Sequence, residues 1–488
     1  MEGDVEPRAG TDVLDTSAAG GLVIRGGVLR TAGHGLGIAL SVGAVAILIR
    51  HLGAADYGRY VTVISLISIV GSLAEAGLTN LGIREYATLE AERRDHVMRN
   101  LLGLRLAISV LGGGIAVGFA VLAGYSGAMV AGAAIGAVGL AVLNAQGSYS
   151  EPLSARLQLG RVTALELVRN LAMLLLTAAL AVVGVDLLGF LAIPAAAAAV
   201  VLVLTLAWVR GALPLRPAFD PAAWRELLRV TVPFAAATAA GTLYVYMIVL
   251  VMSLLSSEEE VGYFGASFRV FIVVSSIAGL LVSAAFPVLA RAARDDRRRL
   301  AYALQRLLEV GLLVGAYLAL VTGLGASIAI EVIAGPDFDP AIETLHVQAG
   351  AILASFVLAV WGFALISLHR HAALLVANAF GLVVSLGLSL LLVTEYGALG
   401  AGITTVIGEV AIAIAYAVAL FRAHPELRPS LRTVWRVLAG AVLALAAGVA
   451  VGSAIAAVVV ATIVYVGAVV ALRAIPDELV DIVRARAG

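Results

Sequence analysis

Three ionisable side chains lie inside long apolar stretches, where each needs a partner. Arg269 stands about two helical turns into the apolar stretch that begins at Gly262, and Glu75 and Glu409 are the acids furthest from any loop. A charge within a bilayer is costly unless it faces a cavity, a counter-charge or a bound ion. Arg269 is predicted to contact an anionic ligand, with an anchor at the membrane surface as the alternative. Glu75 and Glu409 could carry a coupling proton or sodium ion, or could each pair with an arginine.

Further basic side chains lie near the ends of the apolar stretches. Arg30 and His34 are spaced to share one helix face and could meet a phosphate group, although Arg30 could equally be a positively charged anchor. Arg84 and Arg306 are further candidates for ligand binding, although anchoring at a helix end is the favoured interpretation of both. Amide side chains inside the spans could bind sugar hydroxyls, although hydrogen bonds between helices are their more common role. These amides are Asn80, Asn144, Gln146, Asn170 and Asn378.

The residue inventory gives no indication of covalent or metal chemistry. The chain has no cysteine, its net charge is zero, and it contains no Walker motif for nucleotide binding. His369 and His371 flank a turn with no third ligand nearby, so no zinc site is predicted. The absence of a basic excess argues against nucleic-acid binding. We therefore expect no catalytic residue, no metal and no cofactor, and we interpret the protein as not being an enzyme.

The composition requires that these residues be positioned by membrane-spanning helices. Of the 488 residues, 61% are hydrophobic and 13% are charged, and the mean hydropathy is +1.04. Because a spanning helix needs about 20 apolar residues, the chain is predicted to be an all-α polytopic membrane protein with about fourteen spans. The predicted spans are 28–50, 58–82, 98–123, 127–149, 162–184, 187–209, 229–255, 262–290, 302–325, 343–367, 372–394, 398–421, 433–451 and 453–473.

The distribution of arginine predicts the topology. Alternate connections carry 29 of the 32 basic residues, all of which are arginine, and Arg105 is grouped with the second connection. Positively charged connections stay in the cytoplasm, so both termini are predicted to be cytoplasmic. As a separate expectation, the membrane is the cell membrane of a bacterium or archaeon. The N-terminal segment is polar and acidic, and it does not read as a signal peptide.

The stretch LIRHLGAADYGRYVTVIS, residues 48–65, has a counterpart later in the chain. A shift of 204 positions places Gly58 on Gly262 and Tyr60 on Phe264, and in both copies a polar turn precedes a helix that ends in a charged segment. This predicts two pseudo-symmetric lobes of six helices, separated by a proline-containing linker. The predicted units are an N-terminal tail (1–27), an N-lobe (28–209), a linker (210–228), a C-lobe (229–421) and two C-terminal helices with a cytoplasmic end (422–488).

With these motifs the chain resembles the polysaccharide-biosynthesis flippases. They are the oligosaccharide-lipid branch of the multidrug, oligosaccharidyl-lipid and polysaccharide exporter (MOP) superfamily. The motifs that carry the resemblance span nearly the whole chain; they are LIRHLGAADYGRY running into VGSLAEAGLTNLGIREYA, VGYFGASFRVF with AAFPVLAR, AGPDFDPA, and EYGALGAGITTVIGEV. The resemblance implies two lobes around a central cavity and alternating access. In the related lipid II flippases an arginine lines the cavity in a context similar to that of Arg269.

The resemblance also implies a substrate, a polyprenyl-pyrophosphate-linked oligosaccharide that passes from the inner to the outer leaflet for surface polysaccharide biosynthesis. The implied partners are this lipid-linked saccharide, membrane lipid and, further, a saccharide polymerase and glycosyltransferases. Two alternatives remain open. An ion-coupled multidrug or small-molecule antiporter of the same superfamily could share the hydropathy pattern, whereas a membrane glycosyltransferase or polymerase would need larger outer loops than the sequence provides.

Overall fold

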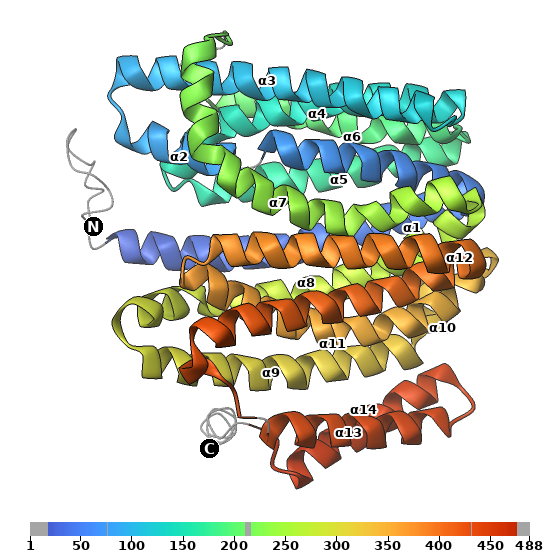
Figure 1. Cartoon of the computed structure of the whole chain (residues 1–488). Coiled ribbons are helices and arrows are strands. Elements are labelled where there is room, and N and C mark those ends of the chain that lie inside the picture. Colours follow the sequence, from blue (N-terminus) through green and yellow to red (C-terminus); the bar gives the residue numbers. More distant parts are fainter. Residues whose placement is uncertain (1–17, 76, 210–215, 431, 476–488) are drawn as a thin grey trace, which may run out of the picture.

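The computed structural model describes residues 18–75, 77–209, 216–430 and 432–475, and within those ranges it contains helices and short loops but no strand (Figure 1). The helices are α1 (Ala18–Glu75), α2 (Leu78–Thr88), α3 (Ala91–Leu122), α4 (Gly127–Ala155), α5 (Leu159–Val183), α6 (Leu187–Trp208), α7 (Pro221–Leu255), α8 (Glu258–Asp295), α9 (Arg297–Leu324), α10 (Ala326–Ile333), η2 (Pro336–Phe338), α11 (Pro340–Ser367), α12 (His371–Ala423), η3 (Pro425–Leu427), α13 (Arg432–Val449) and α14 (Ala454–Ala471). The predicted all-α class is confirmed.

The number of membrane crossings follows from helix length and from two glycines. Eleven helices of the described chain are long and apolar enough to span a bilayer. Two of them, in α1 and α12, have 40 and 53 residues, and each is interrupted by a glycine with non-helical backbone, Gly53 (φ 71°) or Gly397 (φ 52°). Each therefore divides into two crossings, and the apolar segment Ala239–Leu255 of α7 adds one more. The described helices thus contain fourteen apolar segments, as the hydropathy pattern predicts.

Short polar residues fix where several of these helices begin. The side chain of Ser126 accepts a hydrogen bond from the Met129 backbone nitrogen at the start of α4. At the start of α9, Asp296 accepts from the backbone nitrogens of Arg298 and Arg299. Such caps satisfy backbone donors that lack an intrahelical acceptor, so each polar loop residue restarts a helix.

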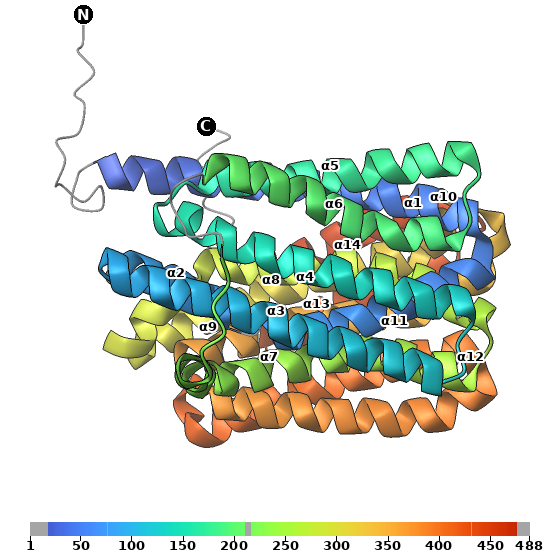
Figure 2. The same ribbon diagram turned by 90° about the horizontal axis from the view of Figure 1, so that it is seen from above.

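The helices pack as two bundles with a smaller pair beside the second. The first bundle contains α1 and α3 to α6, the second contains α7, α8, α9, α11 and α12, and the pair α13 and α14 packs on α9 (Figure 1). Seen from above, the long helices run side by side with their loops gathered at two ends (Figure 2). The bundles are joined mainly through α1, which packs against both α7 and α8.

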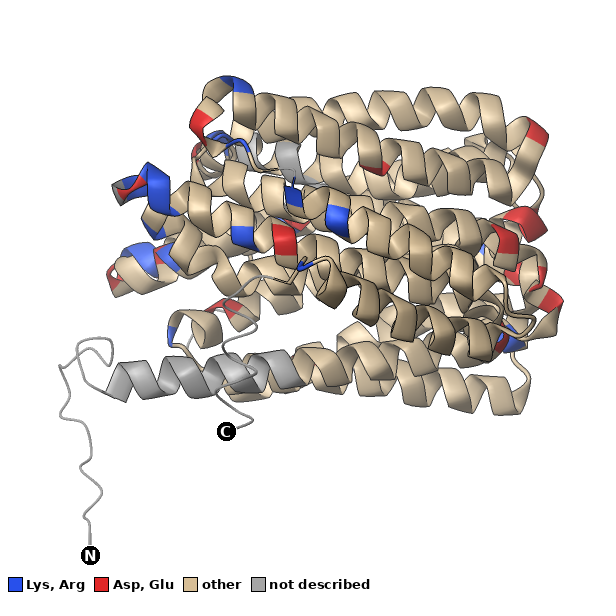
Figure 3. Ribbon diagram, turned by 90° about the horizontal axis from the view of Figure 1, so that it is seen from below, with Lys and Arg blue, Asp and Glu red and all other residues tan. Residues whose placement is uncertain are grey.

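One end of the molecule carries most of the basic residues. This arginine-rich end, which we define by the α2–α3, α4–α5, α8–α9 and α11–α12 connections, gathers most of the arginines (Figure 3). The opposite end, defined by Gly53, Gly397 and the α3–α4, α5–α6 and α7–α8 connections, carries mainly acidic residues (Figure 3).

The two copies of the repeated motif meet each other at the opposite end. A Cβ atom on Gly58 of α1 would overlap the carbonyl oxygen of Glu258 in α8, and one on Gly262 would overlap the carbonyl oxygen of Ala54. These two contacts are related by the same shift of 204 positions that aligns the motifs in the sequence. The two contacts are therefore reciprocal, as a two-fold relation between the bundles requires. Only glycine, which has no Cβ, allows the two backbones to approach so closely. We call this close approach the glycine contact.

Charged side chains surround the glycine contact. Arg59 forms ion pairs with Glu258 at 2.6 Å and with Asp56 at 2.8 Å. Glu260 accepts a hydrogen bond of 2.6 Å from the backbone nitrogen of Ala398, next to the interruption at Gly397. The polar residues that break the apolar pattern at 48–65 thus hold the two bundles together at this end.

Some predicted segments lie partly or wholly outside the described residues. Residues 1–17 of the predicted tail, 210–215 of the predicted linker and 476–488 at the C-terminus belong to this group. The remainder of the linker packs along α3, where the backbone nitrogen of Ala218 donates to the carbonyl oxygen of Arg99 at 2.9 Å. Asp220 then caps α7, which begins at Pro221.

Candidate functional site

The helix that carries Glu75 is interrupted, although the sequence predicts an unbroken span over 58–82. Helix α1 ends at Glu75, α2 begins at Leu78, and Gly77 between them has the left-handed φ of 83°. The Thr79 hydroxyl donates to the Glu75 carboxylate at 3.3 Å. Inside a membrane, an interrupted helix is tolerated where its backbone is buried in protein or lines a cavity, and transporters commonly place binding sites at such breaks.

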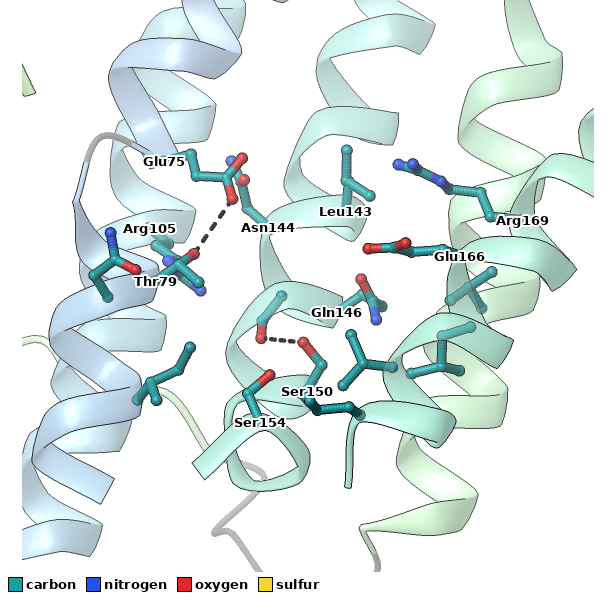
Figure 4. A pocket seen from close by; sticks show the side chains of 17 residues that line it. Glu75, Thr79, Arg105, Leu143, Asn144, Gln146, Ser150, Ser154, Glu166 and Arg169 are labelled. Carbon is teal, nitrogen blue, oxygen red and sulfur yellow. Dashed lines mark hydrogen bonds between the residues drawn. The ribbon is translucent and has the colours of Figure 1, made fainter. Parts of the chain in front are cut away.

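A cavity of about 570 Å³ opens beside this interruption, within the first bundle (Figure 4). Glu75 and Asn144 lie on one side of it, and Glu166 and Arg169 extend into it from α5 on the other side. Its lining residues are Glu75, Thr79, Asn80, Ile83, Arg105, Leu143, Asn144, Gln146, Gly147, Ser150, Ser154, Leu159, Val162, Leu165, Glu166, Arg169 and Val201. We call it the polar cavity, because ten of these side chains carry a polar or charged group in a bundle that is otherwise apolar.

A buried ion pair forms part of its wall. Arg105 of α3 and Glu151 of α4 are each 1% exposed, and a guanidinium nitrogen lies 3.0 Å from a Glu151 oxygen. The same guanidinium donates to the Ser148 hydroxyl at 2.8 Å and to the Thr79 hydroxyl at 2.7 Å. Glu151 fits because Gly82 of α2 leaves room, since a Cβ there would overlap the carboxylate. Charges buried this deeply are costly unless paired, so the pair fixes α3 against α4 and α2.

The pair is not predicted from the sequence, where the position of one member is also predicted wrongly. Arg105 is grouped there with the arginines of the second connection, but the structure buries it inside α3. A signal was available, because Arg105 lies as far inside its predicted span (98–123) as Arg269 lies inside its own. Glu151 gives a weaker signal, because it lies close to the end of α4 and directly before Pro152.

A second cavity of about 370 Å³ adjoins the polar cavity at Glu75. Both are lined by Glu75, Leu143 and Asn144, and the second one also reaches Thr242 and Tyr246 of α7. We call it the inter-bundle cavity, because α7 belongs to the second bundle. Glu75 therefore stands at the junction of a polar space within the first bundle and a more apolar space between the bundles.

Glu409, the other predicted coupling acid, lies in the second bundle and does not join Glu75. It is 9% exposed, and its carboxylate accepts hydrogen bonds from the Ser355 hydroxyl at 2.8 Å and the Tyr244 hydroxyl at 3.2 Å. No arginine forms an ion pair with it among the described residues. A structural Glu–Arg pair, one of the two interpretations left open by the sequence, is therefore not formed there.

Arg269 bridges the two bundles. Its guanidinium donates to the Ser41 hydroxyl of α1 at 2.5 Å, and the side chain is half-buried. It lines neither the polar cavity nor the inter-bundle cavity. The predicted contact of Arg269 with a ligand therefore stays a prediction. Its hydrogen bond to Ser41 joins the two bundles where they would separate if the cavity between them opened.

The remaining candidates lie apart from one another. Arg84 is exposed and pairs with Glu85 at 2.6 Å, and Arg306 pairs with Glu309 at 2.7 Å. His34 is exposed on α1. Arg30 lies on the same helix, but its side chain is outside the described residues. The structure thus groups Glu75 with the amides Asn80, Asn144 and Gln146, and it does not gather Arg84, Arg269 and Arg306 into one cluster.

Comparison with known proteins shows what the chain is similar to. A family model described as "Polysaccharide biosynthesis protein" matches residues 23–293, which is more than half of the chain. No curated protein matches the chain as a relative.

Two solved structures share most of the fold. The "Lipid II flippase MurJ, inward closed conformation" superposes with a TM-score of 0.78 at 11% identity, covering 91% of this chain and 99% of that one. The "Inward-facing conformation of a multidrug resistance MATE family transporter of the MOP superfamily" superposes with a TM-score of 0.61 at 15% identity, covering 80% of this chain and 95% of that one. The fold is thus that of MOP-superfamily transporters, and the chain is a multi-pass membrane protein that belongs to the polysaccharide biosynthesis protein family.

Proposed function

We propose that the protein is a flippase that moves a polyprenyl-pyrophosphate-linked oligosaccharide from the inner to the outer leaflet by alternating access. The observation that carries this proposal is the polar cavity of about 570 Å³, which lies among apolar helices in a member of the polysaccharide biosynthesis family. A saccharide head group cannot cross hydrocarbon unless its hydroxyl groups are hydrogen-bonded, so such a cavity supplies what the transfer needs.

The proposed orientation follows from charge. Connections rich in arginine stay in the cytoplasm, so the arginine-rich end is proposed to be cytoplasmic, with both termini on that side. The polar cavity adjoins this end, because Ser154, Leu159 and Val162 stand where α4 ends and α5 begins. The glycine contact closes the opposite end. The arrangement would suit loading of a head group from the inner leaflet.

Outward release would require the glycine contact to separate. The ion pairs of Arg59 with Glu258 and Asp56 are partly exposed, so each contributes little stability and can be broken cheaply. A contact of this kind suits a gate, since it is specific in geometry but modest in energy. Opening there with closing at the arginine-rich end would complete the alternating cycle.

Coupling to an ion is assigned to Glu409, with Glu75 as the second candidate. Glu409 has only neutral hydrogen-bond partners among the described residues, so its charge is balanced by a proton or a bound cation when it is buried. Glycosyltransferases would act before this protein to build the saccharide, and a polymerase would act after it.

The test is transbilayer movement of a fluorescent polyprenyl-pyrophosphate oligosaccharide in liposomes that contain the purified protein. Movement that depends on the protein, and not on a heat-inactivated sample, is the expected result. Absence of movement with several glycans and imposed proton and sodium gradients would contradict the proposal. If the same liposomes instead transport small cationic drugs, the antiporter alternative is correct.

A further inference from the structure

The polar cavity is lined by two acidic and two basic side chains, so it lacks the excess of positive charge that a phosphate-binding site needs. Arg105 is occupied, because it is buried and its guanidinium contacts Glu151, Ser148 and Thr79. Among the described side chains, a ligand in the cavity would meet one available guanidinium, that of Arg169, and the carboxylates of Glu75 and Glu166. Two carboxylates beside one cation repel an anion, so a pyrophosphate would gain little attraction there.

The groups that remain available suit neutral hydroxyl groups. Glu166 and Arg169 form no hydrogen bond or ion pair with any other described residue, and they point into the cavity from α5 (Figure 4). Asn80 is exposed to the same space, and Ser150 and Ser154 line it from α4. A sugar hydroxyl both donates and accepts a hydrogen bond, so a wall that mixes carboxylates, amides, hydroxyls and a guanidinium matches it in both roles.

The size and the position of the cavity agree with a part of a larger ligand. Its volume of about 570 Å³ lies in the range of about 300–1,000 Å³ that is usual for small-molecule sites. It adjoins the inter-bundle cavity, because Glu75, Leu143 and Asn144 line both spaces. A ligand that spans both spaces could place an uncharged end in the polar cavity while its remaining part stays between the bundles.

We propose that the polar cavity binds the uncharged sugar residues of the lipid-linked head group and that the pyrophosphate is held elsewhere. This inference rests on the proposed flippase function and adds a division of the substrate between two sites. Glu75, Glu166, Arg169 and Asn80 contact the sugar residues, and the Arg105–Glu151 pair is a positioning element that keeps α2, α3 and α4 in place around them.

The test compares two ligands on the full-length protein in detergent, with binding measured by native mass spectrometry. One is the pool of polyprenyl-pyrophosphate oligosaccharides extracted from membranes of the source organism, and the other is the synthetic polyprenyl pyrophosphate without sugar. We expect the double variant Glu166→Gln with Arg169→Gln to weaken binding of the first about tenfold or more, because two charged hydrogen-bonding groups are lost. Binding of the second should stay within about twofold.

Two further variants keep this test decisive. Arg161→Gln removes an arginine of the same helix that does not line the cavity, and it should leave binding of both ligands unchanged. Asn80→Ala removes one exposed amide from α2 and should weaken only oligosaccharide binding. This variant takes the place of the double variant if the double variant does not fold.

Each other outcome overturns the inference in a recognisable way. An equal loss for both ligands would place the pyrophosphate in the polar cavity. No loss for either would show that the cavity does not contact the head group. A wild-type protein that binds neither ligand would contradict the flippase proposal itself, whereas the two outcomes above leave that proposal intact.

Discussion

The glycine contact predicts that one added methyl group shifts the protein toward its outward-open state. A Cβ on Gly58 would lie 2.9 Å from the backbone nitrogen of Gly262, whereas ordinary contacts begin at 3.4 Å. The helices α1 and α8 must therefore separate by at least about 0.5 Å, and further to clear the carbonyl oxygen of Glu258. The obstructing atoms are backbone atoms, so no side chain can rotate away.

The size of the effect follows from the cost of overpacking. Forcing an extra methyl into a close-packed contact costs about 1–3 kcal/mol, and here the cost falls only on the state in which the contact is closed. The ratio of closed to open protein should fall about 5- to 150-fold. The double variant Gly58→Ala with Gly262→Ala should shift the ratio by less than the sum of the single effects, because one separation of the helices relieves both overlaps.

The assay uses the fact that the chain has no cysteine. Ser68 lines the inter-bundle cavity and lies ten residues beyond Gly58 on α1, or about 15 Å further from the opposite end. Ser68→Cys therefore reports access to the cavity, measured as the rate of labelling by a membrane-impermeant maleimide added outside. Gly58→Ala should raise this rate by the factor given above.

The matched control is Gly114→Ala on α3, where an added Cβ meets nothing within 4 Å. It should leave the labelling rate of Ser68→Cys unchanged. The reasoning is refuted if Gly58→Ala raises the rate no more than Gly114→Ala does, with both variants folded as judged by thermal unfolding. In that case the contact does not hold this end of the molecule closed.

Three further predictions concern the buried ion pair, the buried acid Glu409 and the helix break at Gly397. Arg105→Leu leaves Glu151 buried without its partner and should lower the free energy of unfolding by about 3–5 kcal/mol. The double variant Arg105→Leu with Glu151→Leu should recover most of that loss, and thermal unfolding in detergent measures both effects. Glu409→Gln keeps a side chain of the same shape, so the protein should stay folded while transport in liposomes loses its dependence on proton and sodium gradients; a retained dependence would remove Glu409 from the coupling step. Gly397→Ala forces a left-handed backbone on alanine and should destabilise the protein by about 1 kcal/mol or more, whereas Gly387→Ala, in open space on the same helix, should not, and equal unfolding temperatures would contradict this.

Hydropathy and charge, read from the sequence, determined the helices and the repeat. The predicted spans coincide with the observed helical segments within a few residues at many ends, because a bilayer selects apolar stretches of fixed length wherever they occur in the chain. The shift of 204 positions between Gly58 and Gly262 was also visible, and the structure turns it into a physical contact. Both properties are local or pairwise patterns of residue type, so no knowledge of packing is needed to find them.

The polar cavity depended on tertiary structure. The sequence identified Glu75 as an intramembrane acid, but the interruption after it arises where α2 packs against α4, and hydropathy does not record that break. Arg105 and Glu151 are 46 positions apart. Although Arg105 lies well inside its predicted span, only the packing of α3 against α4 brings the two side chains to 3.0 Å. A charge becomes paired or unpaired, and a cavity polar or apolar, only when helices from distant parts of the chain are placed side by side. Composition therefore decides that the chain lies in a membrane, and packing decides which of its few charges can meet a ligand.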